Sequence, residues 1–314
     1  MTGTKLRPPT RSVAPTGRPP RQGKPLLQQL VPYLFAAPSI AVVTVILAVP
    51  VVYGFYKSLY RAEFFGGDEE FVGLDNYSQL MQDPAFQHAF VKTSIFVGGC
   101  IVLSTVLGLF FAFALHNVIR QLRFVRAFSI APYLISSVAA AVMFRMLFNA
   151  EFGLINRMLG LVGIDGLRWL SDPNLAMVTV ILCQVWTDLP LTILLLLGGL
   201  QTIDSGYLDA ALVDGASGLR RSLHISIPLI MPQLVLSTIW MSYSTLTGLG
   251  TILALTGGGP IDATRTIPLE MYFLAFDQLR TNEALAVATA LLVLNAGLTL
   301  VYYLFGRRFD IDAS

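Results

Sequence analysis

Long apolar runs alternate with short polar segments along most of the chain. A helix needs about 20 mainly apolar residues to cross the roughly 30 Å hydrocarbon layer of a bilayer. The runs that reach this length are about Pro32–Tyr56, Thr93–His116, Phe124–Phe148, Leu175–Leu200, Ile225–Ala254 and Ala284–Phe305. The pattern therefore predicts an all-α polytopic membrane protein with six transmembrane helices.

The fifth run, Ile225–Ala254, is longer than one membrane crossing requires. It holds two prolines and two glycines that weaken or interrupt a helix: Pro228, Pro232, Gly248 and Gly250. We therefore expect this segment to begin in the membrane interface and to break or bend near its far end.

Composition and charge agree with a membrane protein and give it an orientation. Hydrophobic residues make up 54% of the chain and charged residues only 13%, as is typical of polytopic membrane proteins. Basic residues gather in alternate polar segments, namely the start of the chain, 120–126, Arg220–Arg221 and Arg307–Arg308, whereas Tyr60–Val91 is rich in acids. Because positive loops stay in the cytoplasm, both termini are predicted to be cytoplasmic.

The first thirty residues differ from the rest of the chain. Residues 1–30 contain six basic residues, no acidic ones and many prolines. Such a composition cannot bury enough apolar surface to fold. We expect a disordered basic cytoplasmic tail over 1–30 and a transmembrane domain over 31–314.

Several chemical signatures are missing from the sequence. No G-x-x-x-x-G-K-[ST] motif occurs, so the chain cannot hydrolyse ATP by the P-loop route. Cys100 and Cys183 lie inside apolar runs and the three histidines are scattered, which suggests neither a disulfide framework nor a metal site. The two cysteines are most simply packing residues, and nothing points to a nucleic-acid partner.

The segment at about 204–224 is polar and glycine-containing although it lies between two apolar runs. Irregular backbone is excluded from lipid, so the segment must lie in the interface or against another protein. A short helix around Asp209, a chain reversal at Gly215 and a second helix starting near Ser217 would make a compact knob. An ordinary solvated loop is the alternative that the pattern leaves open.

This segment resembles the EAA loop of permeases in ATP-binding cassette (ABC) importers. The matching residues are Asp209, Ala210, Ala211, Asp214, Gly215, Ala216 and the distal stretch Ile225–Pro228. The chain departs from the family pattern by Asp209 for glutamate, Leu219 for tryptophan and Ser222 for phenylalanine. The resemblance implies that residues 204–224 couple the permease to its ATPase.

Three further stretches resemble signatures of the sugar-importer branch, which serves maltose, trehalose and glycerol phosphate. They are Phe148–Gly160, Trp169–Met177 and Leu255–Pro268. The likeness is to the first of two permease subunits, with trehalose importers as the leading candidates. It implies a type I importer permease fold in a non-catalytic, multi-pass subunit surrounded by the lipid of a bacterial cytoplasmic (inner) membrane. It also implies a homologous second permease, an extracytoplasmic sugar-binding lipoprotein, and a dimer of ATP-binding subunits that holds ATP and magnesium, with no cofactor in this chain.

Polar residues inside the apolar runs mark a candidate substrate pathway, because such residues are expensive in a membrane. Asp188 is the only acid well inside a run. The candidate pathway residues are Tyr133, Ser137, Gln184, Thr187, Asp188, Ser244, Thr245 and Gly248. All but Ser244 match sugar-contacting positions of the maltose permease by the resemblance, and Ser244 belongs to the same polar patch. The alternative is that these hydroxyls bond within their own helices.

Two other classes of function remain as alternatives. An ion-coupled secondary transporter would carry inverted repeats and paired charges inside the membrane, whereas only Asp188 is available. An intramembrane enzyme would need several acids with metal-binding spacing, for which Asp209 and Asp214 alone are insufficient.

Overall fold

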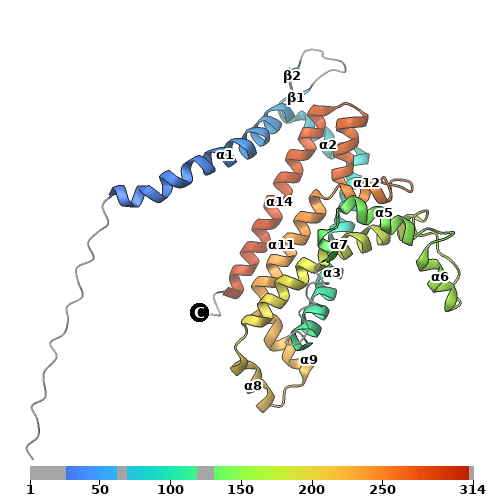
Figure 1. The fold of residues 1–314 in the computed structure, drawn as a ribbon. Coiled ribbons are helices and arrows are strands. Elements are labelled where there is room, and N and C mark those ends of the chain that lie inside the picture. Colours follow the sequence, from blue (N-terminus) through green and yellow to red (C-terminus); the bar gives the residue numbers. More distant parts are fainter. Residues whose placement is uncertain (1–25, 62–68, 119–130, 311–314) are drawn as a thin grey trace, which may run out of the picture. The chain divides into compact units, whose positions relative to one another are not determined.

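Helices dominate the computed structural model, which describes residues 26–61, 69–118 and 131–310 (Figure 1). Side chains of residues 26–34, 117–118 and 307–310 are outside this description. The α-helices are α1 Leu26–Ser58, α2 Asp75–Gln82, α3 Pro84–Val118, α5 Ser137–Leu147, α6 Leu154–Leu161, α7 Pro173–Thr202, α8 Ser205–Val213, α9 Gly218–Arg221, α10 Ile227–Leu229, α11 Met231–Thr247, α12 Gly250–Leu255, α13 Ile267–Tyr272 and α14 Thr281–Asp310. The shorter elements are a 3₁₀ turn η1 Ala131–Leu134, π-helical turns η2 Ser222–Ser226 and η3 Phe273–Asp277, and strands β1 Tyr60–Arg61 and β2 Glu70–Phe71.

Several helices are long and apolar enough to cross a membrane. In the described residues they are Phe35–Ser58, Pro84–His116, Pro173–Thr202 and Thr281–Gly306, and the bent pair Gly218–Leu229 with Met231–Thr247 makes a fifth if it is counted as one span. The chain is therefore a helical membrane protein, as predicted. The number of six spans stays a prediction.

The third predicted span, Phe124–Phe148, is described only in part. Its first residues, 124–130, lie outside the described residues, as does the basic cluster at 120–126. The described remainder is η1 followed by α5, whose 11 residues cover only about 16 Å at 1.5 Å per residue. Helix α5 is therefore too short to cross a bilayer by itself.

The chain divides into two compact units, Met1–Pro50 and Val51–Ser314. Residues 1–25 of the predicted tail lie outside the described residues, and α1 begins at Leu26, inside the segment assigned to that tail.

In the second unit, α3, α7 and α11 pack against one another, and α14 packs against α11 (Figure 1). Phe96, Val180 and Met241 belong to the core cluster of this packing, together with Cys100 and Cys183. Both cysteines are free and buried, which agrees with their predicted packing role.

The fifth apolar run is interrupted twice. Its two helical parts meet at Ile230 with a bend of 73°, next to the π-helical turn Ser222–Ser226 and to Pro228, which cannot donate a backbone hydrogen bond. At the far end α11 stops at Thr247, Gly248 has an extended backbone, and α12 starts at Gly250. The predicted far break is therefore confirmed, and the bend at Ile230 is an addition that the sequence did not indicate.

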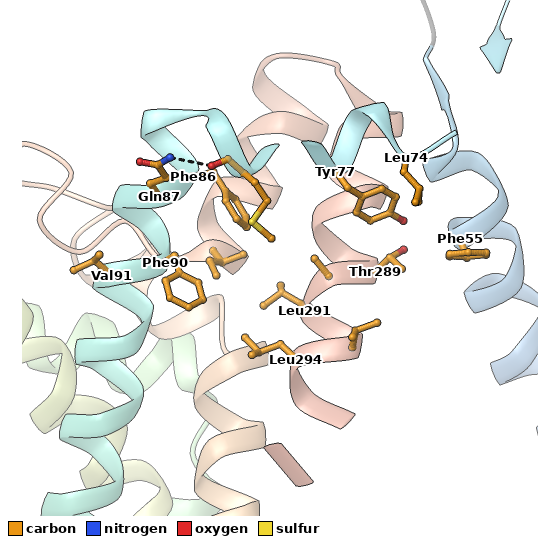
Figure 2. A pocket seen from close by; sticks show the side chains of 14 residues that line it. Phe55, Leu74, Tyr77, Phe86, Gln87, Phe90, Val91, Thr289, Leu291 and Leu294 are labelled. Atoms are coloured by element: carbon orange, nitrogen blue, oxygen red, sulfur yellow. Dashed lines mark hydrogen bonds between the residues drawn. The ribbon is translucent and has the colours of Figure 1, made fainter. Parts of the chain in front are cut away.

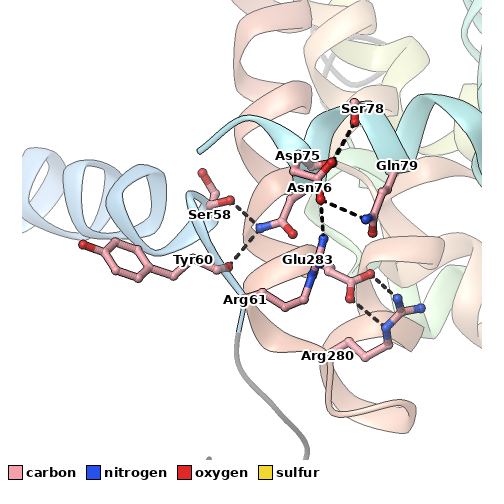
Figure 3. Close-up of polar contacts among 9 residues, drawn as sticks. All are labelled: Ser58, Tyr60, Arg61, Asp75, Asn76, Ser78, Gln79, Arg280 and Glu283. Carbon is pink, nitrogen blue, oxygen red and sulfur yellow. Dashed lines mark hydrogen bonds and ion pairs between the residues drawn. The ribbon is translucent and has the colours of Figure 1, made fainter. Parts of the chain in front are cut away.

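A group of polar contacts joins the end of α1, strand β1, helix α2 and the start of α14 (Figure 3). Strands β1 and β2 pair antiparallel, with Tyr60 opposite Phe71, a hairpin that the all-α prediction did not include. The buried Asn76 donates from Nδ2 to the carbonyl oxygens of Ser58 at 2.8 Å and Tyr60 at 2.9 Å. Ion pairs join Arg61 to Asp75 and Arg280 to Glu283. Asn76 thus joins the end of α1 to α2 through hydrogen bonds to two backbone carbonyl oxygens.

Candidate functional site

Helix α7 carries three of the candidate pathway residues on one face. Its start is fixed by Asp172, whose carboxylate accepts hydrogen bonds from the backbone of Asn174 and Leu175, with Pro173 at the first turn. Within the helix, Thr187 and Asp188 follow Gln184 by three and four residues, so both lie about one turn from it. All three are buried against neighbouring helices.

Asp188 joins α7 to α11 through a buried hydrogen-bond network. Its side chain is only 5% exposed. Gln184 Nε2 donates to Asp188 Oδ2 at 2.7 Å, and Ser244 Oγ donates to the same oxygen at 2.6 Å. Gln184 Nε2 also lies 3.3 Å from Ser244 Oγ. Burying a carboxyl group without hydrogen-bond partners costs free energy. The hydrogen bonds from Gln184 and Ser244 offset part of that cost for Asp188.

A cavity of about 250 Å³ opens beside this network, among α5, α7, α11 and α12. It is lined by Ser137, Gln184, Thr187, Asp188, Trp240, Tyr243, Ser244, Thr247, Gly248, Gly250 and Thr251. Six of the eight predicted pathway residues therefore meet at one place, although they come from three separate segments of the sequence. The cavity presents hydroxyl, amide and carboxylate groups together with two aromatic rings, which is the chemistry that a polyhydroxylated ligand needs.

The other two predicted pathway residues do not line this cavity. Thr245 is buried and its hydroxyl bonds within its own helix, to the carbonyl oxygens of Met241 and Ser242. Tyr133 lies on η1, where its ring centroid is 6.3 Å from that of Trp240. For Thr245 the alternative of bonding within the helix is confirmed. Thr187 also bonds its own helix, to Cys183 O at 3.0 Å, although it lines the cavity.

Five lining residues were not among the predicted pathway residues: Trp240, Tyr243, Thr247, Gly250 and Thr251. A signal for Trp240 exists in the sequence, because it precedes Ser244 by four residues and so shares its helix face. Gly250 permits a close approach of α12 to α5, since a Cβ there would lie 2.7 Å from Ser137 Oγ. That approach is a tertiary contact and has no local signature.

Two polar atoms in the cavity wall have no hydrogen-bond partner among the described residues. They are Gln184 Oε1 and Trp240 Nε1, both buried. One is an acceptor and the other a donor. Leaving such groups unpaired inside the helical packing costs free energy.

The segment at 204–224 folds as the predicted knob. Asp204 caps α8 by accepting a hydrogen bond from Gly206 N. The helix ends at Val213, with Asp214 as its C-cap, and Gly215 follows with a φ of +74°. The turn is a Schellman motif. In it, Ala216 N donates to Ala211 O at 2.9 Å and Gly215 N donates to Leu212 O at 3.1 Å. Of the two possibilities left open by the sequence, the helix–turn–helix is confirmed.

The knob lies at the opposite end of the second unit from α2 (Figure 1). Asp209 and Asp214 lie on it with exposed side chains, while Ala211 is 5% exposed and supports the turn from inside. Val213 and Leu219 are 88% and 73% exposed. Large apolar side chains displayed on an ordered turn are typical of a protein contact surface.

A larger hollow of about 750 Å³ lies elsewhere, between α3 and α14 near α2 (Figure 2). Its described lining is mostly apolar, contributed by residues such as Phe86, Phe90, Leu291 and Leu294, and it contains no Asp, Glu, Lys, Arg or His. Such a surface offers too few hydrogen-bond partners for a sugar. The smaller polar cavity is therefore the better candidate for a substrate site.

Comparisons with known proteins agree with this arrangement. Residues 104–311 match a family described as "Binding-protein-dependent transport system inner membrane component". The chain is 34% identical over 280 residues to the trehalose/maltose transport system permease protein MalF of Thermococcus litoralis, covering 88% of this chain and 93% of the relative. It is 32% identical over 286 residues to the sn-glycerol-3-phosphate transport system permease protein UgpA of Agrobacterium fabrum, covering 89% and 96%.

Among solved structures, a bacterial alginate ABC transporter in complex with alginate pentasaccharide-bound periplasmic protein has a similar fold. The TM-score is 0.74 at 20% identity, covering 91% of this chain and 96% of that one. A second structure of a bacterial ABC transporter involved in alginate import gives a TM-score of 0.72 at 21% identity, with 91% and 98% covered. These likenesses show that the chain has the fold of an ABC importer permease.

Proposed function

The chain belongs to the family of binding-protein-dependent transport system inner membrane components, and we propose that it forms half of the translocation pathway of an ATP-driven sugar importer. The observation that carries the proposal is the polar cavity around Asp188, enclosed by helices that are otherwise apolar. Among the sugars, we propose a disaccharide such as trehalose, in keeping with a relative named for trehalose and maltose. The chain is a permease rather than an enzyme.

We propose that ATP hydrolysis is coupled to transport through contacts with the knob at 204–224. The chain has no P-loop, so a dimer of ATP-binding subunits, carrying ATP and magnesium, would grip the knob. Asp209, Ala210 and Ala211 on α8, with Asp214, Gly215 and Ala216 at the turn, form the proposed contact. Closure of that dimer would move the knob as a rigid lever, which its hydrogen-bonded turn and exposed apolar side chains support.

The other proposed partners complete the pathway and deliver the sugar. A homologous second permease would close the open side of the cavity, and an extracytoplasmic sugar-binding lipoprotein would deliver the substrate. The alginate transporter with its periplasmic protein supports this assembly by analogy of fold.

The proposed function has a direct test in cells that carry the whole importer. Deleting this chain should abolish ATP-dependent uptake of radiolabelled trehalose or maltose, and restoring the gene should recover it. Glycerol 3-phosphate is measured in parallel, because one class of relatives is named for it. Unchanged uptake of all three solutes after deletion would refute the proposal. Uptake that persists without ATP but follows an ion gradient would support the secondary-transporter alternative instead.

We further propose cytoplasmic termini and a cytoplasmic knob, and we expect Leu219→Cys to react with a membrane-impermeant thiol reagent only after the cells are permeabilised. Asp262→Cys, at a half-exposed position in the loop before α13, should react in intact cells. The reason is the alternation of basic segments along the chain. The unmodified chain is the control, since Cys100 and Cys183 are buried. Labelling of Leu219→Cys in intact cells would overturn this orientation.

A further inference from the structure

We propose that the helical segment Gly218–Leu229 lies along the cytoplasmic surface of the bilayer and binds the headgroups of anionic phospholipids through Arg220 and Arg221. This segment, called the basic arm below, comprises α9, the π-helical turn η2 and α10. The inference rests on the proposed cytoplasmic position of the knob and adds a lipid partner to it. The basic arm follows the residues assigned to the ATP-binding subunits, 209–216, and is separate from them.

The direction of the basic arm indicates that it follows the membrane surface. Helix α11 packs against α3, α7 and α14, each of which is long and apolar enough to cross a membrane. The basic arm meets α11 at Ile230 with a bend of 73°, so it runs nearly perpendicular to α11. Ile230 is fully buried in a core cluster with Ala112 of α3 and Leu196 of α7, which holds the junction in place. A helix in this position extends sideways where α11 enters the bilayer.

The basic arm is amphipathic in the way that suits a membrane surface. Leu219 and Leu223 lie one turn apart and are exposed. Beside them, Arg220 and His224 are also one turn apart and exposed, with His224 Nδ1 3.1 Å from Arg220 O. Helices that lie in the membrane interface place an apolar stripe toward the acyl chains and cations among the headgroups. Because the bend is less than a right angle, the arm rises from Ile230 toward the cytoplasm, and Leu219 lies nearer to water than Leu223.

Charge divides the knob into two arms of opposite sign. Residues 204–217 contain three aspartates and no basic residue, whereas the basic arm contains two arginines, a histidine and no acid. Among the described side chains, no acid forms an ion pair with Arg220 or Arg221. An anionic bilayer surface attracts juxtamembrane basic segments and repels acids. The same field therefore draws the basic arm to the lipid and turns residues 204–217 away from it, toward the ATP-binding subunits.

The exposed apolar surface continues from the basic arm into α11. Leu229, just before the bend, and Leu236, on α11, are both exposed. Exposed leucines on both sides of the junction are expected where a surface segment runs into a span that faces lipid. The combination of this apolar surface with unpaired arginines fits a phospholipid, which has an acyl chain and a phosphate, better than it fits a purely polar partner.

The test uses the complete importer, purified and placed in nanodiscs of phosphatidylcholine and phosphatidylglycerol in one fixed proportion. A fluorophore is attached at Leu223→Cys. Either the phosphatidylcholine or the anionic phosphatidylglycerol carries bromine on its acyl chains, and bromine quenches the fluorophore on contact. The ratio of the two quenching values therefore reports which headgroup is enriched at the basic arm. The unmodified chain gives the background, since Cys100 and Cys183 are buried.

We expect brominated phosphatidylglycerol to quench Leu223→Cys at least about fivefold more strongly than brominated phosphatidylcholine, the factor that one arginine contributes near an anionic surface. Adding Arg220→Gln and Arg221→Gln should bring the two values to within about twofold of each other, because the attraction is lost. Leu236→Cys, beyond the bend, should be quenched equally by both lipids. Val213→Cys, at the end of α8, should be quenched by neither.

A matched control separates the two arginines from the total charge of the chain. Arg157→Gln with Arg168→Gln removes the same charge from two exposed positions outside the knob and should leave the ratio at Leu223→Cys unchanged. Absence of quenching at Leu223→Cys overturns the membrane position and shows that protein covers the arm. Equal quenching by both lipids overturns the binding of anionic headgroups. The proposed coupling fails separately, if the ATP-binding subunits do not co-purify with the unmodified chain.

Discussion

Replacing Gly215 by valine is expected to leave the protein inserted in the membrane and to lower binding-protein-stimulated ATP hydrolysis by at least about tenfold. Gly215 has a φ of +74°, a conformation that a β-branched residue adopts at a cost of about 1–3 kcal/mol. A Cβ at this position would meet no atom within 4 Å. The damage is therefore confined to the backbone of the turn, and the spans keep their packing.

The chain offers a matched control three residues away. Gly218 lies in α9 without a positive φ, and a Cβ there also meets no atom within 4 Å. Gly218→Val should therefore retain coupling, and Gly215→Asn should retain most of it because asparagine tolerates the left-handed region. The measurements are co-purification of the ATP-binding subunits and ATP hydrolysis in reconstituted vesicles. Full stimulation in Gly215→Val would show that the knob is a passive turn.

Replacing Asp188 by alanine should reduce sugar uptake at least about tenfold while the yield of assembled complex changes less than about twofold. The substitution removes the acceptor shared by Gln184 Nε2 and Ser244 Oγ. Gln184 Nε2 keeps its contact with Ser244 Oγ at 3.3 Å, but Ser244 Oγ loses its acceptor, and both side chains would reorient into the cavity. Uptake of radiolabelled sugar and the recovery of the purified complex are measured on the same preparations.

A second buried polar contact of α7 provides the control for Asp188→Ala. Thr192 bonds Ser104 of α3 at 3.0 Å through the two hydroxyls and is not part of the cavity lining. Thr192→Val keeps its shape, so uptake per assembled complex should stay within about twofold of the unmodified protein. If Asp188→Ala instead lowers the yield and transports normally per complex, its hydrogen bonds serve only to hold α7 against α11.

The knob shows how far local sequence rules reach. The knob needs a helix cap at Asp204, a short helix and a chain reversal at Gly215, all within a dozen residues. Each of these features depends only on its immediate neighbours in the sequence. The interruption near Gly248 was predictable for the same reason. By contrast, the 73° bend at Ile230 depends on how a π-helical turn and two helices settle against the rest of the unit, which proline positions alone do not specify.

The cavity shows where those rules stop. Ser244 and Thr245 are adjacent hydroxyl residues on α11, yet one donates to Asp188 and the other bonds back to its own helix. Which hydroxyl faces the network depends on the rotation of α11 about its axis, and the helix is apolar on several sides, so its sequence carries no strong preference. The same rotation of α11 places Trp240 at the cavity.

By itself the sequence determined that this is a helical membrane protein, because a bilayer demands long apolar runs with internally satisfied backbones. It also predicted the knob, with a solvated loop as the alternative, because a chain reversal of this kind requires a residue that tolerates a positive φ. Only the tertiary structure decided which polar groups meet. Asp188 and Ser244 are 56 residues apart, and the packing of α7 against α11 that brings them together depends on side-chain fit over the whole interface rather than on any local pattern.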